Sequence, residues 1–356
     1  MAPAAALFLC FWSASCYRKG KPKESDFMYH ADENRYSAVP VRHAGKSGLM
    51  LPAISLGLWR HFGSTDALAA RREVILAAFD RGVFHFDVAN HYGDGDFGSS
   101  ESLLGQILSR DLKLYRDELV ISTKVGYEIH PGPYGTGTSR KAVLQGIDDS
   151  LQRLQLDYVD LFYAHRFDDT VDVAETVRAL DDVVRQGKAL YIGVSNYDTP
   201  QAKRAIRMFQ DLGTPFVVDQ MSYNMFNRSV ETSGLLDVLR DAGAGLVAYG
   251  PLSEGLLSDR YLGGIPETFK IHPTNQGTFA AGRAAVVTKL NALNDLAQGR
   301  GQTLAQMALA WLLRDPVVTS VIIGTTSVAH LEDNLKACAH LDFTADELAQ
   351  IDAIIK

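Results

Sequence analysis

The strongest constraint on the fold is an alternation of two hydrophobic periods along the chain. Short apolar runs rich in β-branched residues recur eight times, and segments with helical periodicity separate them. Nearly continuous apolar runs are typical of parallel strands that are covered on both faces. We therefore predict strands near residues 54–58, 83–88, 119–124, 159–165, 189–195, 216–221, 245–249 and 320–324.

The separating segments carry apolar residues at the spacing of an amphipathic helix. One such helix is expected to begin near Ser139, with a buried face formed by Val143, Ile147, Leu151 and Leu154. Alternating strands and helices with short links predict βα units and a parallel sheet. Eight units favour an α/β fold of the closed (β/α)8 TIM-barrel type. The alternative is an open doubly wound sheet, which normally has a glycine-rich fingerprint after its first strand; residues 57–60 do not match one.

Two segments fall outside this repeat. Residues 36–51, with a turn at 45–48, predict an N-terminal β-hairpin at the bottom of the barrel. The extra length between residues 251 and 320 predicts a polar loop near 253–282 and extra C-terminal helices near 283–299 and 303–314. Long loops of this kind are usually functional or disordered.

Residues 1–27 differ in composition from the rest of the chain. Their apolar stretch, residues 4–12, is too short to span a bilayer, and basic residues follow it, whereas a secretory signal has them first. We expect residues 1–27 to be a disordered extension and residues 28–356 to form a single domain. An upstream start before Met28 and a lipoprotein-like site at Cys16 are the alternatives.

Charge and cysteine content exclude several classes of function. The net charge of −7 comes without a basic stripe, which argues against nucleic acid and anionic membrane as partners. The three cysteines and the absence of metal-ligand spacing predict neither a disulfide framework nor a metal site. The same cysteine usage favours a reducing, cytoplasmic location.

Polar residues follow the predicted strands, where the active site of such a barrel is expected. Asp87 ends the second strand, and Tyr92 lies in the loop after it. Lys124 ends the third strand and His165 the fourth. An acid inside an apolar run needs a partner, and Lys124 is the candidate cation. Taken alone, such a pair is equally compatible with a purely structural ion pair.

These four residue types suit one kind of chemistry. A tyrosine with an ordinary pKa of about 10 is a poor acid at neutral pH, and a buried ammonium beside it is expected to lower that pKa. A carboxylate orients the lysine, and a histidine hydrogen-bonds the substrate oxygen. This is general acid–base equipment for interconverting a carbonyl and an alcohol. It supplies a proton but no hydride, so a nicotinamide cofactor is implied.

Six motifs in this order resemble the aldo-keto reductase superfamily, from about Tyr36 to the C-terminus. They lie at residues 87–93, 122–124, 165–166, 193–196, 219–220 and 249–252. Further details at 45–49, 56–59, 131–135 and 222–228 resemble two groups within it, the bacterial L-glyceraldehyde 3-phosphate reductases and the voltage-gated potassium channel β-subunits. The insertion at 131–135 favours the reductase group.

The resemblance implies a role for each matched residue. Tyr92 would donate the proton, Asp87 and Lys124 would tune it, and His165 would orient the substrate. Asp87 is also expected among the cofactor-binding residues, with Leu58, Trp59, Ser195, Asn196, Gln220, Tyr249, Gly250, Leu252, Glu254, Arg260, Gly324, Thr326, His330, Asp333 and Asn334.

One departure from the superfamily bears on the cofactor. Related reductases carry Ser-Arg where this chain has Thr326 and Ser327, and usually Gln where it has His330. A 2′-phosphate favours Arg or Lys. The expected cofactor is therefore NADP(H), with NAD(H) as an alternative and weak discrimination between the two.

Two functions follow from the resemblance. The first is an NADP(H)-dependent reductase of small aldehydes, such as L-glyceraldehyde 3-phosphate or methylglyoxal, working as a homo-oligomer. The second is a redox-sensing binding protein with slow or no turnover, like the channel β-subunits. Because the β-subunits keep the same four residues, the site alone does not separate these functions.

Overall fold

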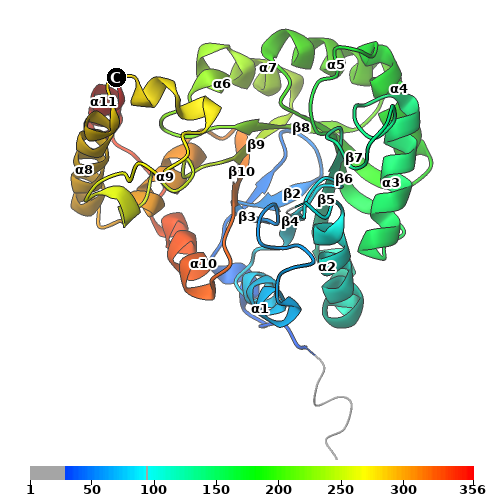
Figure 1. The fold of residues 1–356 in the computed structure, drawn as a ribbon, viewed down its shortest axis with the longest axis horizontal. Coiled ribbons are helices and arrows are strands. Elements are labelled where there is room, and N and C mark those ends of the chain that lie inside the picture. The colour runs from blue at the N-terminus through cyan, green and yellow to red at the C-terminus, as the bar shows by residue number, and fades with distance from the viewer. Residues whose placement is uncertain (1–28, 94) are drawn as a thin grey trace, which may run out of the picture. The chain divides into compact units, whose positions relative to one another are not determined.

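Eight parallel strands of the described chain close into a barrel with helices around it (Figure 1). The computed structural model describes residues 29–93 and 95–356, so the extension expected over 1–27 lies outside the described residues. The fold is formed by the unit Ala31–Lys356. Its barrel strands, in order around the barrel, are β10 (Val318–Ile323), β3 (Ile54–Gly57), β4 (His85–Asp87), β5 (Val120–Val125), β6 (Val159–Ala164), β7 (Ala189–Ser195), β8 (Phe216–Ser222) and β9 (Gly245–Tyr249). The predicted TIM barrel is confirmed.

Helices cover the outside of the barrel (Figure 1). They are α1 (Leu68–Phe79), α2 (Ser99–Ile107), α3 (Arg140–Leu154), α4 (Val173–Arg185), α5 (Thr199–Leu212), α6 (Ser229–Thr232), α7 (Leu235–Ala242), α8 (Arg283–Gly299), α9 (Leu304–Leu313), α10 (Val328–Leu335) and α11 (Ala345–Ile355). A π-helical turn, Leu108–Leu112, continues α2. Short 3-10 helices are Arg35–Ser37, Lys113–Glu118, Asp259–Tyr261, Pro273–Asn275, Gly277–Phe279 and Lys336–Ala339.

Local sequence signals explain where these helices begin. Ser139 caps α3 by accepting a hydrogen bond from the backbone N–H of Ala142, as its position before the apolar stripe predicts. The stripe itself is buried as expected. In α5, Asp198 and Gln201 form a reciprocal capping box. The expected C-terminal helices appear as α8 and α9, within a few residues of their predicted bounds.

The predicted hairpin consists of β1 (Val41–His43) and β2 (Met50–Pro52), paired antiparallel. Its turn lies against the amino-terminal end of β9, because the backbone N–H of Lys46 donates to the carbonyl of Gly243 at 2.7 Å. Gly45 has a φ of +57°, and a Cβ there would lie 2.0 Å from that same carbonyl oxygen. The hairpin therefore lies at the barrel end opposite the carboxyl ends of the strands, as predicted.

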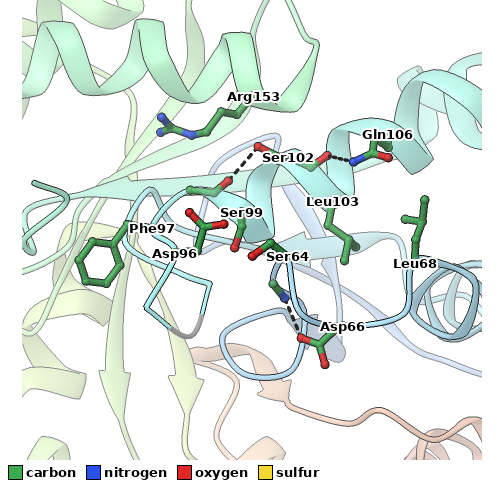
Figure 2. A pocket seen from close by; sticks show the side chains of 12 residues that line it. Ser64, Asp66, Leu68, Asp96, Phe97, Ser99, Ser102, Leu103, Gln106 and Arg153 are labelled. Atoms are coloured by element: carbon green, nitrogen blue, oxygen red, sulfur yellow. Dashed lines mark hydrogen bonds between the residues drawn. The ribbon is translucent and has the colours of Figure 1, made fainter.

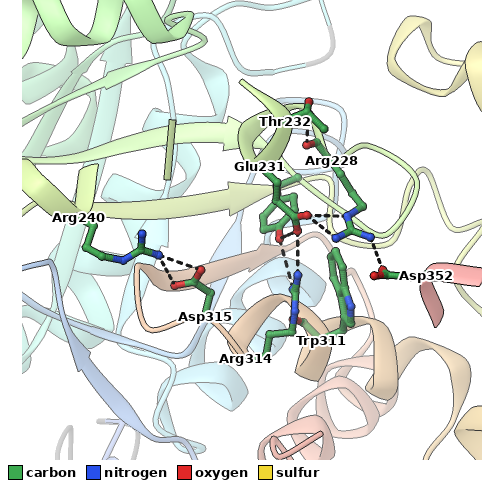
Figure 3. Close-up of polar contacts among 9 residues, drawn as sticks. Arg228, Glu231, Thr232, Arg240, Trp311, Arg314, Asp315 and Asp352 are labelled. Carbon is green, nitrogen blue, oxygen red and sulfur yellow. Dashed lines mark hydrogen bonds and ion pairs between the residues drawn. The ribbon is translucent and has the colours of Figure 1, made fainter. Parts of the chain in front are cut away.

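A polar network fixes the segment after β8 to the C-terminal helices (Figure 3). Glu231 of α6 accepts hydrogen bonds from Arg228 at 2.7 Å and from Arg314 at 2.8 Å, and it also bonds the hydroxyl of Tyr223. Both guanidinium groups pack on the ring of Trp311 in α9, with their central carbons 5.2 and 3.6 Å from its centroid. The network therefore holds the loop that follows β8 at the mouth of the barrel.

Among the residues that the structure describes, no helix combines the length and the apolar character that crossing a bilayer requires.

Candidate active site

A pocket of about 710 Å³ opens at the carboxyl ends of the barrel strands. This volume lies within the usual range of small-molecule sites. The predicted site residues that line it are Trp59, Asp87, Tyr92, His165, Asn196, Gln220, Tyr249, Gly250, Leu252, Glu254, Gly324, Thr326 and His330. They come from the ends of β3, β4 and β6 to β10 and from the loops and helices that follow these strands. The structure thus brings most of the predicted site together in one cavity.

Lys124 is the centre of the polar groups at the floor of this pocket. Its side chain is fully buried, and its three ammonium N–H bonds all have acceptors. They donate to Asp87 Oδ2 at 2.5 Å, to the carbonyl of Val88 at 2.8 Å and to Tyr92 Oη at 3.2 Å. Because Tyr92 Oη accepts from the lysine, its own proton is directed elsewhere. The hydroxyl proton of Tyr92 can therefore point into the pocket, which Tyr92 lines.

Both carboxylate oxygens of Asp87, which holds this lysine, accept hydrogen bonds. Its Oδ1 accepts from Ser122 Oγ at 2.6 Å and from Gln220 Nε2 at 3.1 Å, while its Oδ2 faces Lys124. Burial lowers the pKa of Lys124, and the neighbouring Asp87 carboxylate opposes that effect. The pair is therefore more than a surface ion pair. It keeps a cation in a place where a cation alone is unfavourable.

The expectation that Lys124 lowers the pKa of Tyr92 is wrong. Burial first, and then the negative charge of Asp87, raise the pKa of Tyr92 well above its ordinary value. The physical reason is that burial disfavours the charged phenolate, and the negative charge of Asp87 disfavours it further. At neutral pH Tyr92 is therefore a protonated phenol, which is the form a proton donor must have.

His165 lies beside Tyr92, with ring centroids 5.7 Å apart. Burial, and then the positive charge of Lys124, lower the pKa of His165 well below its ordinary value, so its ring is neutral. Its Nδ1 is buried and has no hydrogen-bond partner among the residues that the structure describes. A neutral imidazole keeps one N–H and one lone pair, so this ring can donate one hydrogen bond to a ligand in the pocket.

Three side chains beside this group are fixed by bonds to one another. Asn196 donates to the carbonyl of His165 at 3.0 Å and to Ser195 Oγ at 3.1 Å, and its Oδ1 accepts from Tyr249 Oη at 2.7 Å. Ser195 Oγ donates to the carbonyl of Gln220 at 2.8 Å. These bonds leave one lone pair on Asn196 Oδ1, which faces the pocket, and one on Ser195 Oγ, which is buried beneath it.

Strained backbone surrounds the same pocket. Non-glycine residues with positive φ line it, namely His61 at +61°, Asn196 at +58°, Ser253 at +52° and Glu254 at +56°. Conformations of this kind are costly and concentrate at functional sites. Ser253 Oγ is held by a 2.8 Å hydrogen bond to Asn275 Oδ1, and both residues are buried.

The sequence prediction missed several lining residues. Tyr127 packs edge-on against His165 at 4.6 Å and also faces His91 at 5.5 Å. It follows β5 by two residues, so the same search for residues after strand ends would have found it. Asn275 lies in the long loop after β9, and the length of that loop was its only sequence signal.

Six predicted residues do not line this pocket. Lys124 and Ser195 are buried beneath it and act through the bonds described above. Leu58 is fully buried, and Arg260 lies on an exposed 3-10 turn near the ring of Tyr261. Asp333 is bonded to Gln306 Nε2 at 3.0 Å, and Asn334 lies in the buried part of α10.

A second pocket of about 290 Å³ lies between the segment 63–68 and the start of α2 (Figure 2). Two of its charged side chains, Asp66 and Arg153, are already paired within the chain. Asp66 accepts from the backbone N–H of Gly63 at 2.9 Å and from Arg71 at 3.0 Å, and Arg153 donates to Glu101 at 2.7 Å. The pocket at the barrel mouth therefore holds the better candidate site.

Comparison with known proteins supports the same conclusion. A model of the aldo/keto reductase family matches residues 53–356. The chain belongs to the aldo/keto reductase family. It is an oxidoreductase, and aldo-keto reductases generally use nicotinamide cofactors and small-molecule substrates.

Its relatives within the family include both groups that the motifs resemble. The L-glyceraldehyde 3-phosphate reductase of Escherichia coli K12 is 46% identical over 331 residues, which cover 91% of this chain and 95% of the relative. A probable voltage-gated potassium channel subunit beta of Arabidopsis thaliana is 36% identical over 304 residues, covering 84% and 91%. The holo form of an aldo-keto reductase from Bacillus halodurans superposes with a TM-score of 0.74 at 24% identity, covering 89% of this chain and 97% of that one. This last similarity concerns the fold.

Proposed function

We propose that this protein reduces small aldehydes to alcohols with NADP(H), and that Tyr92 is the proton donor. The arrangement of Lys124 carries the proposal, because its three hydrogen bonds leave the proton of Tyr92 free to point into the pocket. The neutral ring of His165 lies beside that proton. Asp87, Tyr92, Lys124 and His165 are thus the proposed catalytic residues.

The donor and acceptor set of the pocket suits a nicotinamide carboxamide. A carboxamide offers two N–H donors and one carbonyl acceptor. The lone pair of Asn196 Oδ1, and that of Ser195 Oγ beneath it, would match the donors, and the amide of Gln220, which lines the pocket, is the proposed partner of the carbonyl. Tyr249, whose hydroxyl is tied to Asn196, would pack on one face of the ring and leave the other toward Tyr92.

The rest of the cofactor would follow the strained loop after β9. Ser253, Glu254 and Gly255 have φ of +52°, +56° and +84° in succession, in a tight turn where the N–H groups of Ser253 and Gly255 donate to the carbonyls of Gly250 and Leu252. We assign the pyrophosphate to Gly250, Leu252 and this loop, with Arg260 adding charge. Leu58 and Trp59 would border the nicotinamide, and the adenosine end would lie near Gly324, Thr326, His330, Asp333 and Asn334.

When bound, the cofactor supplies the hydride. Tyr92 gives its proton to the carbonyl oxygen of the aldehyde as negative charge develops there. The ammonium of Lys124, donating to Tyr92 Oη, stabilises the phenolate that remains, and Asp87 keeps the ammonium charged. His165 donates a hydrogen bond to the same substrate oxygen. Each contact strengthens as charge develops, so the four residues favour the transition state over the bound aldehyde.

Basic and imidazole side chains at the pocket opening are the candidate contacts for an anionic aldehyde such as L-glyceraldehyde 3-phosphate. On the substrate side, Arg60, His61 and His91 line the opening, and the carboxylates that line the cavity are Asp87 and Glu254. Asp87 is already neutralised by Lys124. Arg60 forms an ion pair with Glu254 at 3.4 Å, and its half-exposed guanidinium is the group that would reach a phosphate on a short aldehyde.

Steady-state kinetics test the proposal. With NADPH and either L-glyceraldehyde 3-phosphate or methylglyoxal, the wild type should turn over, and Tyr92→Phe should lose at least about a hundredfold in kcat, as expected for a lost general acid. If no aldehyde in a broad panel is reduced faster than by this variant, the reductase proposal fails. Tight NADPH binding without turnover would instead favour the redox-sensing role suggested by the 36% identity to a channel β-subunit.

The homo-oligomer and the cytoplasmic location stay predictions. Size-exclusion chromatography with light scattering tests the first, and fractionation of the source cells tests the second.

A further inference from the structure

A buried chain of hydrogen bonds runs from Asp87 to the backbone near the hairpin. Ser122 Oγ donates to Asp87 Oδ1 at 2.6 Å, and His85 Nε2 lies 2.9 Å from Ser122 Oγ. His85 Nδ1 lies 2.8 Å from Ser55 Oγ, and Ser55 Oγ lies 2.6 Å from Ser320 Oγ. Ser320 Oγ donates to the carbonyl of Pro52 at 2.7 Å.

These side chains lie inside the barrel, below the pocket. Asp87 bonds Gln220, which comes from the far side of the barrel, so its side chain points inward. His85 is two residues before Asp87 on β4 and shares that face. The side chains of Ser55, His85, Ser122 and Ser320 are all fully buried, so water does not compete for their bonds.

Counting protons shows that, when His85 is neutral, this chain of hydrogen bonds has fewer protons than links. It has five links, and both of its ends, the Pro52 carbonyl and the Asp87 carboxylate, can only accept. Three hydroxyls and one neutral imidazole supply four protons. One link therefore lacks a proton, and the tautomer of His85 decides which one.

The two tautomers place the unfilled link at opposite ends. With hydrogen on Nε2, His85 donates to Ser122, so the Ser122 hydroxyl is free to donate to Asp87. With Ser55 donating to Nδ1, the unfilled link then lies at Ser320. With hydrogen on Nδ1, the Ser320 end is filled, and Ser122 must serve either His85 or Asp87. Bonds to an ionised acceptor are roughly twice as strong as neutral ones, so the first arrangement is favoured.

We propose that Ser122 is a positioning residue for Asp87, and that His85, held as the Nε2–H tautomer by Ser55, fixes the direction of the Ser122 hydroxyl. The proposal rests on the proposed function, because it assigns Ser122 a role in orienting the carboxylate that holds Lys124 and Tyr92. Burial lowers the pKa of His85 to about 4, and the opposed charges of Asp87 and Lys124 act on it as well, which supports a neutral ring at neutral pH.

Two serine variants at opposite ends of the chain test the kinetic part. Ser122→Ala removes the bond to Asp87 and should lower kcat about tenfold, while the KM for aldehyde and the Kd for NADPH change less than about threefold. Ser320→Ala is the matched control, because it removes a hydroxyl where the unfilled link already lies. Its kcat should stay within about twofold of the wild type. Equal losses of kcat in the two variants would overturn the proposal.

Nitrogen-15 NMR of histidine-labelled protein tests the tautomer without any turnover. The full chain should show a His85 ring with a protonated Nε2 and an unprotonated Nδ1, assigned by its absence in His85→Asn. The pattern should persist in Ser320→Ala. An Nδ1–H ring in the wild type would refute the inference. If the enzyme reduced no aldehyde at all, the proposed function would fail, yet this spectrum would still report on His85 and Ser122.

Discussion

Asp87→Asn is the change that most directly tests how the site works. The substitution keeps the size and one oxygen of the side chain. Its Oδ1 can still accept from Ser122 and Gln220, which donate at 2.6 and 3.1 Å in the wild type. The Nδ2 group would instead face Lys124 Nζ, where Asp87 Oδ2 lies at 2.5 Å. Two donors would then meet, and the negative charge would be gone.

The size of the effect follows from the charge of Lys124. Burial lowers the pKa of this lysine, and Asp87 is the main group that opposes that effect. Without the carboxylate the pKa of Lys124 falls further, which shifts the lysine toward the neutral amine. Tyr92 then loses the cation that stabilises its phenolate. General acid–base catalysis is typically worth 10²–10⁴-fold, so kcat should fall by about a hundredfold or more.

The assay is kcat across pH together with the Kd for NADPH. Because Gln220 keeps its acceptor, Kd should change less than about threefold. The kcat of Asp87→Asn should recover partly as pH falls, since the amine regains its proton, whereas the wild type should show no such gain. A kcat within threefold of the wild type at neutral pH would refute the reasoning. Asp219→Asn is the matched control, since Asp219 is a fully buried strand aspartate with no side-chain hydrogen-bond partner among the described residues.

Three further outcomes are expected. Burial raises the pKa of Asp219 well above its ordinary value. The contribution of Asp219 to stability is therefore full below about pH 4, where Asp219 is protonated in both states, and it is lost as pH rises. Calorimetry should show that the gain in melting temperature of Asp219→Asn over the wild type grows with pH. In fluorescence titrations, the wild type should prefer NADPH over NADH by less than about a thousandfold, and Ser327→Arg should raise that preference about tenfold or more. The variant should also lose roughly 1 kcal/mol of folding stability, because Ser327 caps α10. Glu231→Gln should lower the free energy of unfolding by about 1–2 kcal/mol in urea titrations, since Arg314 loses its carboxylate partner and Arg228 keeps only Asp352. Unchanged stability would show that the network in Figure 3 is replaceable.

The barrel was predictable because its information is local. Each strand is a short apolar run and each helix an apolar stripe, so the period alone separates them. Ser139 and Gln201 fix helix starts within a few residues. Asp87 and Lys124 could be paired in advance because a buried acid needs a cation, and parallel strands end at the same edge of the sheet. Those constraints need no coordinates.

The missed features depend on distances between segments far apart in sequence. Tyr127 could have been listed as a residue after β5, but its packing on His165 could not, and Asn275 joins the site because a loop folds back onto Ser253. The sign of the Tyr92 pKa depends on whether burial and a carboxylate outweigh a lysine that lies 3.2 Å from its oxygen. Composition and spacing identify these groups, but they do not show which effect on the pKa of Tyr92 is larger.

The opposing effects of burial and Lys124 also explain how a phenol with a raised pKa can serve as the proton donor. Burial makes Tyr92 hold its proton in the ground state, because a phenolate charge in this low-dielectric site is unfavourable. The same low dielectric strengthens the attraction between a developing phenolate and the ammonium of Lys124. The lysine therefore contributes little while the phenol is intact and most when the proton has left. An interaction that grows along the reaction lowers the barrier, whereas one already present in the ground state would not.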